Sequence, residues 1–136
     1  MKKIAILIPI YNDWKSLIKL LDEINISIQD IQNCEFSCIV VDDSSILQQP
    51  KISKPSNLQS LNIISMRENR GHARCNAFGI RYIDNTKKFD YVILMDGDGE
   101  DRPVEIKDLV IKIKNSPDNS VVAKRIKRSE GSIFQL

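Results

Sequence analysis

The sequence contains only three cysteines, and they do not have the spacing of a disulfide framework or a zinc site. Cys34, Cys38 and Cys75 include no CxxC pair, and their number is odd. Disulfide-rich secreted domains and zinc modules usually show paired cysteines at short intervals. We therefore expect three free thiols that pack as small apolar side chains, in a protein of the reducing cytoplasm.

Aromatic residues and excess charge are also scarce. Phe, Trp and Tyr make up 6% of the 136 residues, and the net charge is +2. Proteins that bind nucleic acid usually present a basic face, and those that bind single strands add aromatic side chains for base stacking. The composition therefore gives no support for a nucleic-acid partner. The one local exception is the basic stretch KRIKR at residues 124–128.

No apolar run approaches the roughly 18 residues that a transmembrane helix needs. The N-terminal sequence MKKIAILIPIYND has a basic start, but its apolar stretch is short and meets Pro9 without a small-residue cleavage site. We interpret it as a first strand and not as a signal peptide. Hydrophobic residues at 42% and charged residues at 28% are typical of a globular protein, and we expect residues 1–136 to form one domain.

The alternation of strand and helix patterns predicts an α/β fold. Strands are expected at 3–10, 36–43, 61–66, 89–96 and 120–125, and helices at 13–28, 71–84 and 103–113. Asp13 is placed to cap the first helix. Ala73, Ala77, Ile80 and Ile83 are expected on the apolar face of the second. This order is typical of a mostly parallel, Rossmann-like sheet with helices on both faces.

Sheets of this class bind ligands beyond the carboxyl ends of their strands. Four predicted strands end in polar clusters, with the sequences PIYND, DDSS, DGDGED and KRIKR. Loops are polar in any fold, but polarity alone does not explain why so many carboxylates follow these strands. The sequence therefore predicts a binding site at this edge of the sheet.

Residues 96–101, DGDGED, place four acidic side chains directly after the fourth predicted strand. Carboxylates forced together raise one another's pKa or recruit a cation, and hard oxygen ligands suit Mg²⁺ or Mn²⁺. Asp96 and Asp98 could both reach one divalent ion, while Gly97 would let a diphosphate come close. The alternative is a solvated acidic turn that caps the next helix, and this reading fits Asp101 better than it fits the pair.

Three other protein classes place acidic residues in comparable positions. An EF-hand loop counted from Asp96 would need Gly at residue 101 and Glu at residue 107, where the chain has Asp and Lys. A haloacid-dehalogenase-type phosphatase places its Asp-x-Asp at the first strand, with Thr or Val where this chain has Glu100. A phosphorelay receiver domain would explain VVDDSS and VILMD, but Lys124 lies too near Asp96 for its later lysine. The receiver remains the non-enzymatic alternative.

Taken together, these segments resemble the family 2 glycosyltransferases of the GT-A fold. ILIPIYND is similar to their opening hhhPhYNE, and IVVDDSS is similar to hVVDDgS. RENRGHARCNAFGI resembles NxGxxxAxxxGh, MDGDGEDRPVEI resembles MDADhQHPPEh, and VVAKRIKRSEGSIF resembles the segment that follows. Five motifs in order are far more specific than any one alone. The branch they resemble most is that of the polyprenyl-phosphate glycosyltransferases, the dolichol-phosphate mannose synthase-like enzymes.

The resemblance implies a nucleotide-binding role for residues of the first two motifs. Pro9, Tyr11 and Asp13 would lie along the nucleotide, with Tyr11 against the base. Asp13 departs from the family pattern, which usually has Glu there. Asp43 would accept hydrogen bonds from base N–H groups, because a carboxylate is the acceptor that an imide N–H requires.

The resemblance also implies a metal and phosphate site in the later motifs. Asp96 and Gly97 would lie beside the ribose and diphosphate of the donor. Asp96, Asp98 and Glu100 would hold Mg²⁺ or Mn²⁺, with Asp98 central to catalysis. Arg125 would face a phosphate of the donor or the acceptor.

The implied reaction is inverting transfer from a UDP- or GDP-sugar, with a polyprenyl phosphate or another glycan as the acceptor. The chain stops before the catalytic Asp or Glu and the Gln-x-x-Arg-Trp segment of relatives with sugar acceptors. We therefore expect an N-terminal fragment, truncated after about the fifth strand. A fragment that binds donor without turnover, contact with the cytoplasmic face of a membrane through KRIKR, and a homo-oligomer all stay open.

Overall fold

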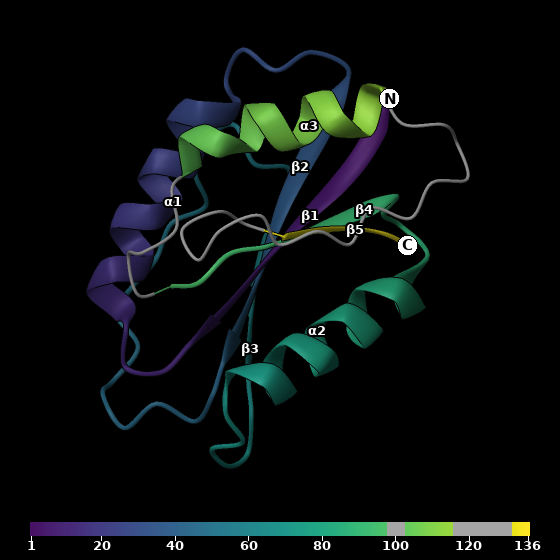
Figure 1. Ribbon diagram of the computed structural model, residues 1–136. Coiled ribbons are helices and arrows are strands. Elements are labelled where there is room, and N and C mark those ends of the chain that lie inside the picture. The colour runs from purple at the N-terminus through teal and green to yellow at the C-terminus, as the bar shows by residue number, and fades with distance from the viewer. Residues whose placement is uncertain (98–102, 116–131) are drawn as a thin grey trace.

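The structure is a computed structural model that describes residues 1–97, 103–115 and 132–136 (Figure 1). Its elements in chain order are β1 (Lys2–Ile10), α1 (Trp14–Ile28), β2 (Cys34–Asp42), β3 (Leu61–Ser65), α2 (His72–Thr86), β4 (Tyr91–Leu94), the 3-10 turn η1 (Pro103–Glu105), α3 (Ile106–Asn115) and β5 (Ser132–Gln135). The strand and helix order predicted from the sequence is confirmed as far as α3.

The strands form one sheet in the order β3-β2-β1-β4-β5. β1 pairs in parallel with β2 and with β4, and β2 pairs in parallel with β3. β5 runs antiparallel to β4, with Val92 opposite Phe134. The expected mostly parallel sheet is confirmed. The strand predicted at 120–125 lies outside the described residues, and β5 at 132–135 was not predicted.

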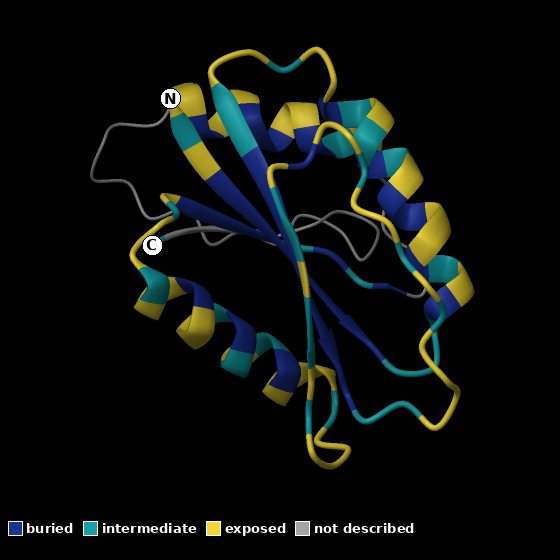
Figure 2. Cartoon of the chain, turned by 180° about the vertical axis from the view of Figure 1, so that it is seen from behind, coloured by how far each residue is buried: buried dark blue, intermediate teal, exposed yellow. Residues whose placement is uncertain are grey.

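The central strand β1 is apolar on both faces because helices cover both sides of the sheet. Its even-numbered isoleucines, from Ile4 to Ile10, pack with α1 and α3. Ala5 and Leu7 point to the other face, where they pack with α2. Figure 1 shows α1 and α3 on one side and α2 on the other, and Figure 2 shows β1 as a buried strip between them. The continuous apolar run in the sequence is therefore the consequence of a three-layer fold.

The prediction of the apolar face of α2 is confirmed for Ile83, and for Ile80 as a half-buried residue, but it is wrong for the two alanines. Ala73 and Ala77 are exposed, whereas Cys75, Gly79 and Ile83 are buried. A Cβ atom added to Gly79 would lie 2.4 Å from Leu7 Cδ1, so the helix approaches β1 more closely than a larger residue would allow. Close packing against β1 requires a small residue at this position of α2. Glycine is not hydrophobic, so a prediction from hydrophobicity alone misses it.

In the described part of the chain, no helix has both the length and the apolar character that a membrane span would require.

Candidate functional site at the carboxyl edge of the sheet

Asp43 follows β2 and is a buried carboxylate at this edge. Its side chain is 1% exposed, and both of its oxygens accept hydrogen bonds from the backbone. Oδ1 accepts from the Arg70 N–H at 2.7 Å, and Oδ2 accepts from the Gly71 N–H at 2.8 Å. Gly71 has φ +89 and forms the N-cap of α2. Asp43 therefore fixes the connection between β3 and α2, a structural role that the sequence did not predict.

Asn12 has a central structural role at the neighbouring loop, although the sequence analysis assigned no role to it within the motif ILIPIYND. Its backbone is left-handed, with φ 61. Its Oδ1 accepts hydrogen bonds from the N–H groups of Ile46 and Leu47 at 2.8 and 2.9 Å. Its own N–H donates to Ser45 Oγ at 2.8 Å. Asparagine tolerates this conformation because its short polar side chain bonds locally, and this preference was the available signal.

Asp42 is held by serine side chains in the same way. Its Oδ1 accepts from the Ser45 N–H at 3.0 Å and from Ser45 Oγ at 2.5 Å, and its Oδ2 accepts from Ser65 Oγ at 3.4 Å. The two aspartates of the DDSS motif thus have different roles. Asp42 shapes the turn after β2, and Asp43 connects β2 to the start of α2.

Asp13 occupies the N-cap position of α1, but the prediction that its side chain caps the helix is wrong. The carboxylate makes no capping hydrogen bond, and Oδ2 accepts from the preceding Tyr11 N–H at 3.2 Å. The backbone of Asp13 has φ −87 and ψ 34, outside the extended region in which an N-cap side chain reaches the helix. Tyr11 and Asp13 are both half-buried at the carboxyl edge of β1.

Pro9 is buried in β1 at the point where β4 separates from it. The register of β4 on β1 ends at Leu7, whose carbonyl accepts from the Met95 N–H at 3.0 Å. Residues two apart in a strand point their backbone groups to the same side, so an N–H at position 9 would have faced β4. Proline has none, and the ladder stops there. The absence of this donor lets Asp96 and Gly97 turn over the end of β1.

Gly97 packs directly on the end of β1. A Cβ atom at this position would lie 2.4 Å from Ile10 Cγ2 and 3.2 Å from the Pro9 carbonyl oxygen. Asp43 lies on the other side of the same strand end, because its N–H donates to the Ile10 carbonyl at 2.9 Å. The turn after β4 and the turn after β2 therefore meet around Ile10. The expectation that these two polar clusters share one edge is confirmed for the described residues.

The predicted metal ligands are only partly within the described residues. Asp96 is half-buried next to Gly97, whereas Asp98, Glu100 and Arg125 lie outside the described residues. Across the part of the chain that the structure describes, no three potential ligands are grouped closely enough to hold an ion by themselves. The described side of the site does supply carboxylate oxygen, which suits a hard divalent cation. The assignment of Asp98 and Glu100 to a metal site with Asp96 therefore stays a prediction.

Cys75 lies beneath this edge on α2, fully buried beside Asp43. Burial, a side-chain hydrogen bond to Asp43 and the charges of Asp43 and Asp42 raise the pKa of the Cys75 thiol to about 12. Burial also raises the pKa values of Cys34 and Cys38. The expectation of free thiols is confirmed for all three cysteines.

Alkylation should distinguish the three thiols, because the thiolate is the nucleophile. In the folded protein at mildly alkaline pH, we expect iodoacetamide to label half-buried Cys34 slowly and to leave Cys75 and Cys38 unlabelled over the same time. All three should react within minutes in guanidinium chloride. Mass spectrometry of the labelled peptides checks the order, and rapid labelling of Cys75 in the folded protein would contradict its burial beneath the carboxyl edge.

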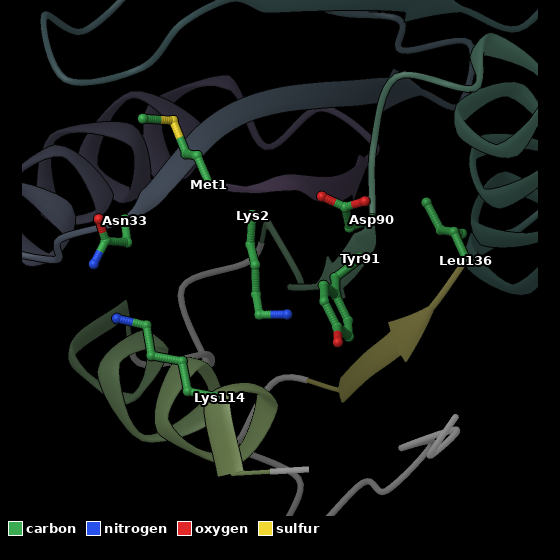
Figure 3. Close-up of a pocket in the computed structure, with 7 residues that line it drawn as sticks. All are labelled: Met1, Lys2, Asn33, Asp90, Tyr91, Lys114 and Leu136. Atoms are coloured by element: carbon green, nitrogen blue, oxygen red, sulfur yellow. The ribbon is translucent and has the colours of Figure 1, made fainter. Parts of the chain in front are cut away.

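The opposite edge of the sheet carries a separate hollow of about 620 Å³, whose lining residues Figure 3 shows. It opens at the amino ends of β1 and β4, where Lys2 Nζ lies 5.3 Å from the centre of the Tyr91 ring. Asp90 in its wall accepts the Lys3 N–H at 2.8 Å. Among the predicted site residues that the structure describes, none lines it. The volume of a hollow alone therefore does not show which edge of the sheet binds a ligand.

The family model named Glycosyl transferase family 2 matches residues 5–135. The chain belongs to glycosyltransferase family 2. Two curated proteins are similar to this chain over most of its length. The undecaprenyl-phosphate 4-deoxy-4-formamido-L-arabinose transferase of Proteus mirabilis is 29% identical over 134 residues, which are 98% of this chain and 40% of that protein. The protein MJ0544 of Methanocaldococcus jannaschii is 26% identical over 118 residues, which are 85% of this chain and 48% of that protein.

Solved structures support the GT-A assignment of the fold. The mannosyltransferase PcManGT from Pyrobaculum calidifontis, in complex with GDP-Man and Mn²⁺, superposes with a TM-score of 0.63 and 19% identity. The match covers 97% of this chain and 44% of that one. The TarS 1-349 fragment of S. aureus, in complex with UDP, gives a TM-score of 0.58 at 23% identity over 84% of this chain and 32% of that one. This family 2 chain spans less than half the length of the curated relatives it matches.

Proposed function

We propose that residues 1–136 form the donor-binding domain of an inverting glycosyltransferase that uses Mg²⁺ or Mn²⁺. The observation that carries this proposal is the meeting of the β2 and β4 turns around Ile10, with Asp43 on one side and Gly97 on the other. Family membership supports glycosyl transfer as the reaction class. A nucleotide laid across this edge would contact Pro9, Tyr11 and Asp13 on β1 and the turn after it.

Asp96, Asp98 and Glu100 are the residues that would hold the cation. When bound, the cation would neutralise the charge that develops on the departing nucleoside diphosphate. Arg125 would contribute a positive charge to a phosphate of donor or acceptor. Asp43 would accept a hydrogen bond from the base. It would also support the site through its hydrogen bonds to the backbone of residues 70 and 71.

The donor is proposed to be a UDP- or GDP-sugar, and the acceptor a polyprenyl phosphate. Structural neighbours hold GDP-Man with Mn²⁺ or UDP, and the Proteus mirabilis relative is named for an undecaprenyl-phosphate acceptor. A phosphate acceptor is largely ionised near neutral pH, so its attack on the anomeric carbon needs little help from a protein base. This chemistry fits a polyprenyl phosphate.

The receiver-domain alternative is not supported. A receiver has the flavodoxin-like strand order 2-1-3-4-5, in which the third strand lies next to the first. In this sheet β3 lies at the outer edge beside β2, and β4 is the second neighbour of β1. The family model that matches the chain is that of glycosyltransferase family 2, not that of a receiver domain.

Titration calorimetry with UDP- and GDP-sugars tests the proposal directly. We expect binding to one nucleotide class with Mn²⁺ and at least about tenfold weaker binding without it, because the diphosphate needs a counter-charge. Asp98→Ala should abolish the dependence on Mn²⁺. Asp101→Ala is the matched control, since it removes a neighbouring acid that is not assigned to the metal.

Two outcomes would contradict the proposal. One is binding of equal strength with and without Mn²⁺ in the wild-type chain. The other is no binding of either nucleotide class to a protein that is folded by circular dichroism.

A further inference from the structure

The loop between β2 and β3 presents two large aliphatic side chains at the carboxyl edge. Ile46 is 81% exposed and Leu47 is 59% exposed. Figure 2 shows exposed and half-buried backbone in this loop, next to the buried strand β2. Single exposed apolar residues are ordinary on protein surfaces. Two consecutive large ones form a small apolar patch, and such patches can mark an interaction site.

This loop is held firmly in place, so the exposure is built into the structure. Asn12 Oδ1 accepts the N–H groups of both Ile46 and Leu47. The Leu47 carbonyl accepts the Trp14 indole N–H at 3.1 Å. Ser44, two residues before Ile46, has a left-handed backbone with φ 60. The protein satisfies these backbone groups, and the two aliphatic side chains are left facing solvent.

The loop and the first turns of α1 carry exposed lysines. A hollow of about 440 Å³ lies between the loop and the start of α1, and Lys15 lines it. Asp13 lines it too, but its carboxylate accepts the Tyr11 N–H. Residues 14–19 and 44–51 carry three lysines, at positions 15, 19 and 51, and no aspartate or glutamate. All three lysines are exposed, but Lys19 Nζ lies 3.9 Å from Glu23 Oε1, so Lys15 and Lys51 carry the positive charge that these two segments present to solvent.

We propose that the loop of residues 44–51 and the first turns of α1 dock onto the surface of an anionic lipid bilayer. Ile46 and Leu47 enter the interface between headgroups and acyl chains, and Lys15 and Lys51 contact anionic headgroups. Aliphatic side chains flanked by lysines are the chemistry that such a surface binds, and neither part alone gives stable attachment. This inference goes beyond the proposed function and does not depend on donor or metal binding.

Cosedimentation with vesicles tests this docking surface without any nucleotide. We expect the chain to bind vesicles of phosphatidylglycerol and phosphatidylcholine, and to bind pure phosphatidylcholine vesicles at least about tenfold more weakly. Ile46→Ser with Leu47→Ser should lower the partition coefficient on anionic vesicles by about tenfold or more. Ile26→Ser is the matched control, because Ile26 is 63% exposed near the far end of α1; it should bind like the wild type.

Lys15→Gln with Lys51→Gln tests the charge contribution. This variant should bind anionic vesicles more weakly than the wild type. It should also lose less of its binding when the salt is raised from about 50 to about 200 mM, because fewer charges are left for the salt to screen. Fluorescence of Trp14, the one tryptophan in the sequence, reports whether each variant keeps the loop in place.

Three results would overturn the proposal. The wild type could fail to bind anionic vesicles, or the Ile46 and Leu47 variant could bind as well as the Ile26 control. The third is a wild-type dimer in lipid-free solution that the same double substitution dissociates, since Ile46 and Leu47 would then be covered by a second copy of the chain.

Discussion

Asp43→Ala is expected to lower the free energy of unfolding by about 3 kcal/mol or more. The substitution leaves the N–H groups of Arg70 and Gly71 without their acceptor at a position where the carboxylate is 1% exposed. Each hydrogen bond to a charged acceptor contributes about 1.5–3 kcal/mol. A loss of this size is a large part of the roughly 5–15 kcal/mol that stabilises a typical domain. Urea unfolding followed by circular dichroism measures it.

Asp43→Asn separates hydrogen bonding from charge at the same site. The amide keeps one acceptor oxygen and the shape of the side chain, so we expect a smaller loss of stability than for alanine. It also removes the negative charge that raises the pKa of Cys75, so the pKa of that thiol should fall while burial keeps it above its usual value. Asp22→Ala on the exposed face of α1 is the control and should change the free energy of unfolding by less than about 0.5 kcal/mol.

The result for Asp43 also bears on donor binding. If the carboxylate reads the base, Asp43→Asn should weaken nucleotide binding at a temperature where the variant is fully folded. If it only holds the start of α2, the folded variant should bind nearly as the wild type does. Stable folding of Asp43→Ala with an unchanged urea midpoint would contradict the role of Asp43 as a buried acceptor of two backbone hydrogen bonds.

The sheet could be predicted well because its strongest signal, the apolar pattern of each strand, lies within a short segment of the sequence. The unbroken apolar run of β1 predicts a strand that is buried on both faces, and residues 4–10 are all buried. The polar clusters after β2 and β4 were placed at one edge by the same reasoning, since parallel strands bring their carboxyl ends together.

The details of the site were harder to predict because they depend on contacts between distant residues. Nothing near Asn12 in the sequence indicates that its side chain will bond residues 46 and 47. Asp13 has the residue type of a helix cap, but its backbone conformation directs the carboxylate to Tyr11. The buried face of α2 was predicted only in part. Gly79 was missed because close packing on β1 favours a small residue there, even one that is not strongly hydrophobic.

Gly97→Ala is expected to reduce both stability and donor binding. The new methyl group would lie 2.4 Å from Ile10 Cγ2, and Ile10 is fully buried and has little room to move. Overpacking of this kind costs about 1–3 kcal/mol. The turn would be displaced from the end of β1, and Asp96 and Asp98 would move with it. We therefore expect Mn²⁺-dependent affinity for the nucleotide-sugar to fall by about tenfold, because ligands must hold their geometry closely.

Gly79→Ala provides a matched control for Gly97→Ala, because its methyl group would also lie 2.4 Å from a buried carbon of β1, in this case Leu7 Cδ1. The clash occurs under α2, away from the carboxyl edge, and the helix gains up to about 1 kcal/mol from alanine. Gly79→Ala should therefore lose stability without losing donor affinity when both variants are titrated below their unfolding transitions. Equal losses of affinity would mean that packing on β1 acts on the whole domain. A loss confined to Gly97→Ala would mean that the turn after β4 is itself part of the donor site.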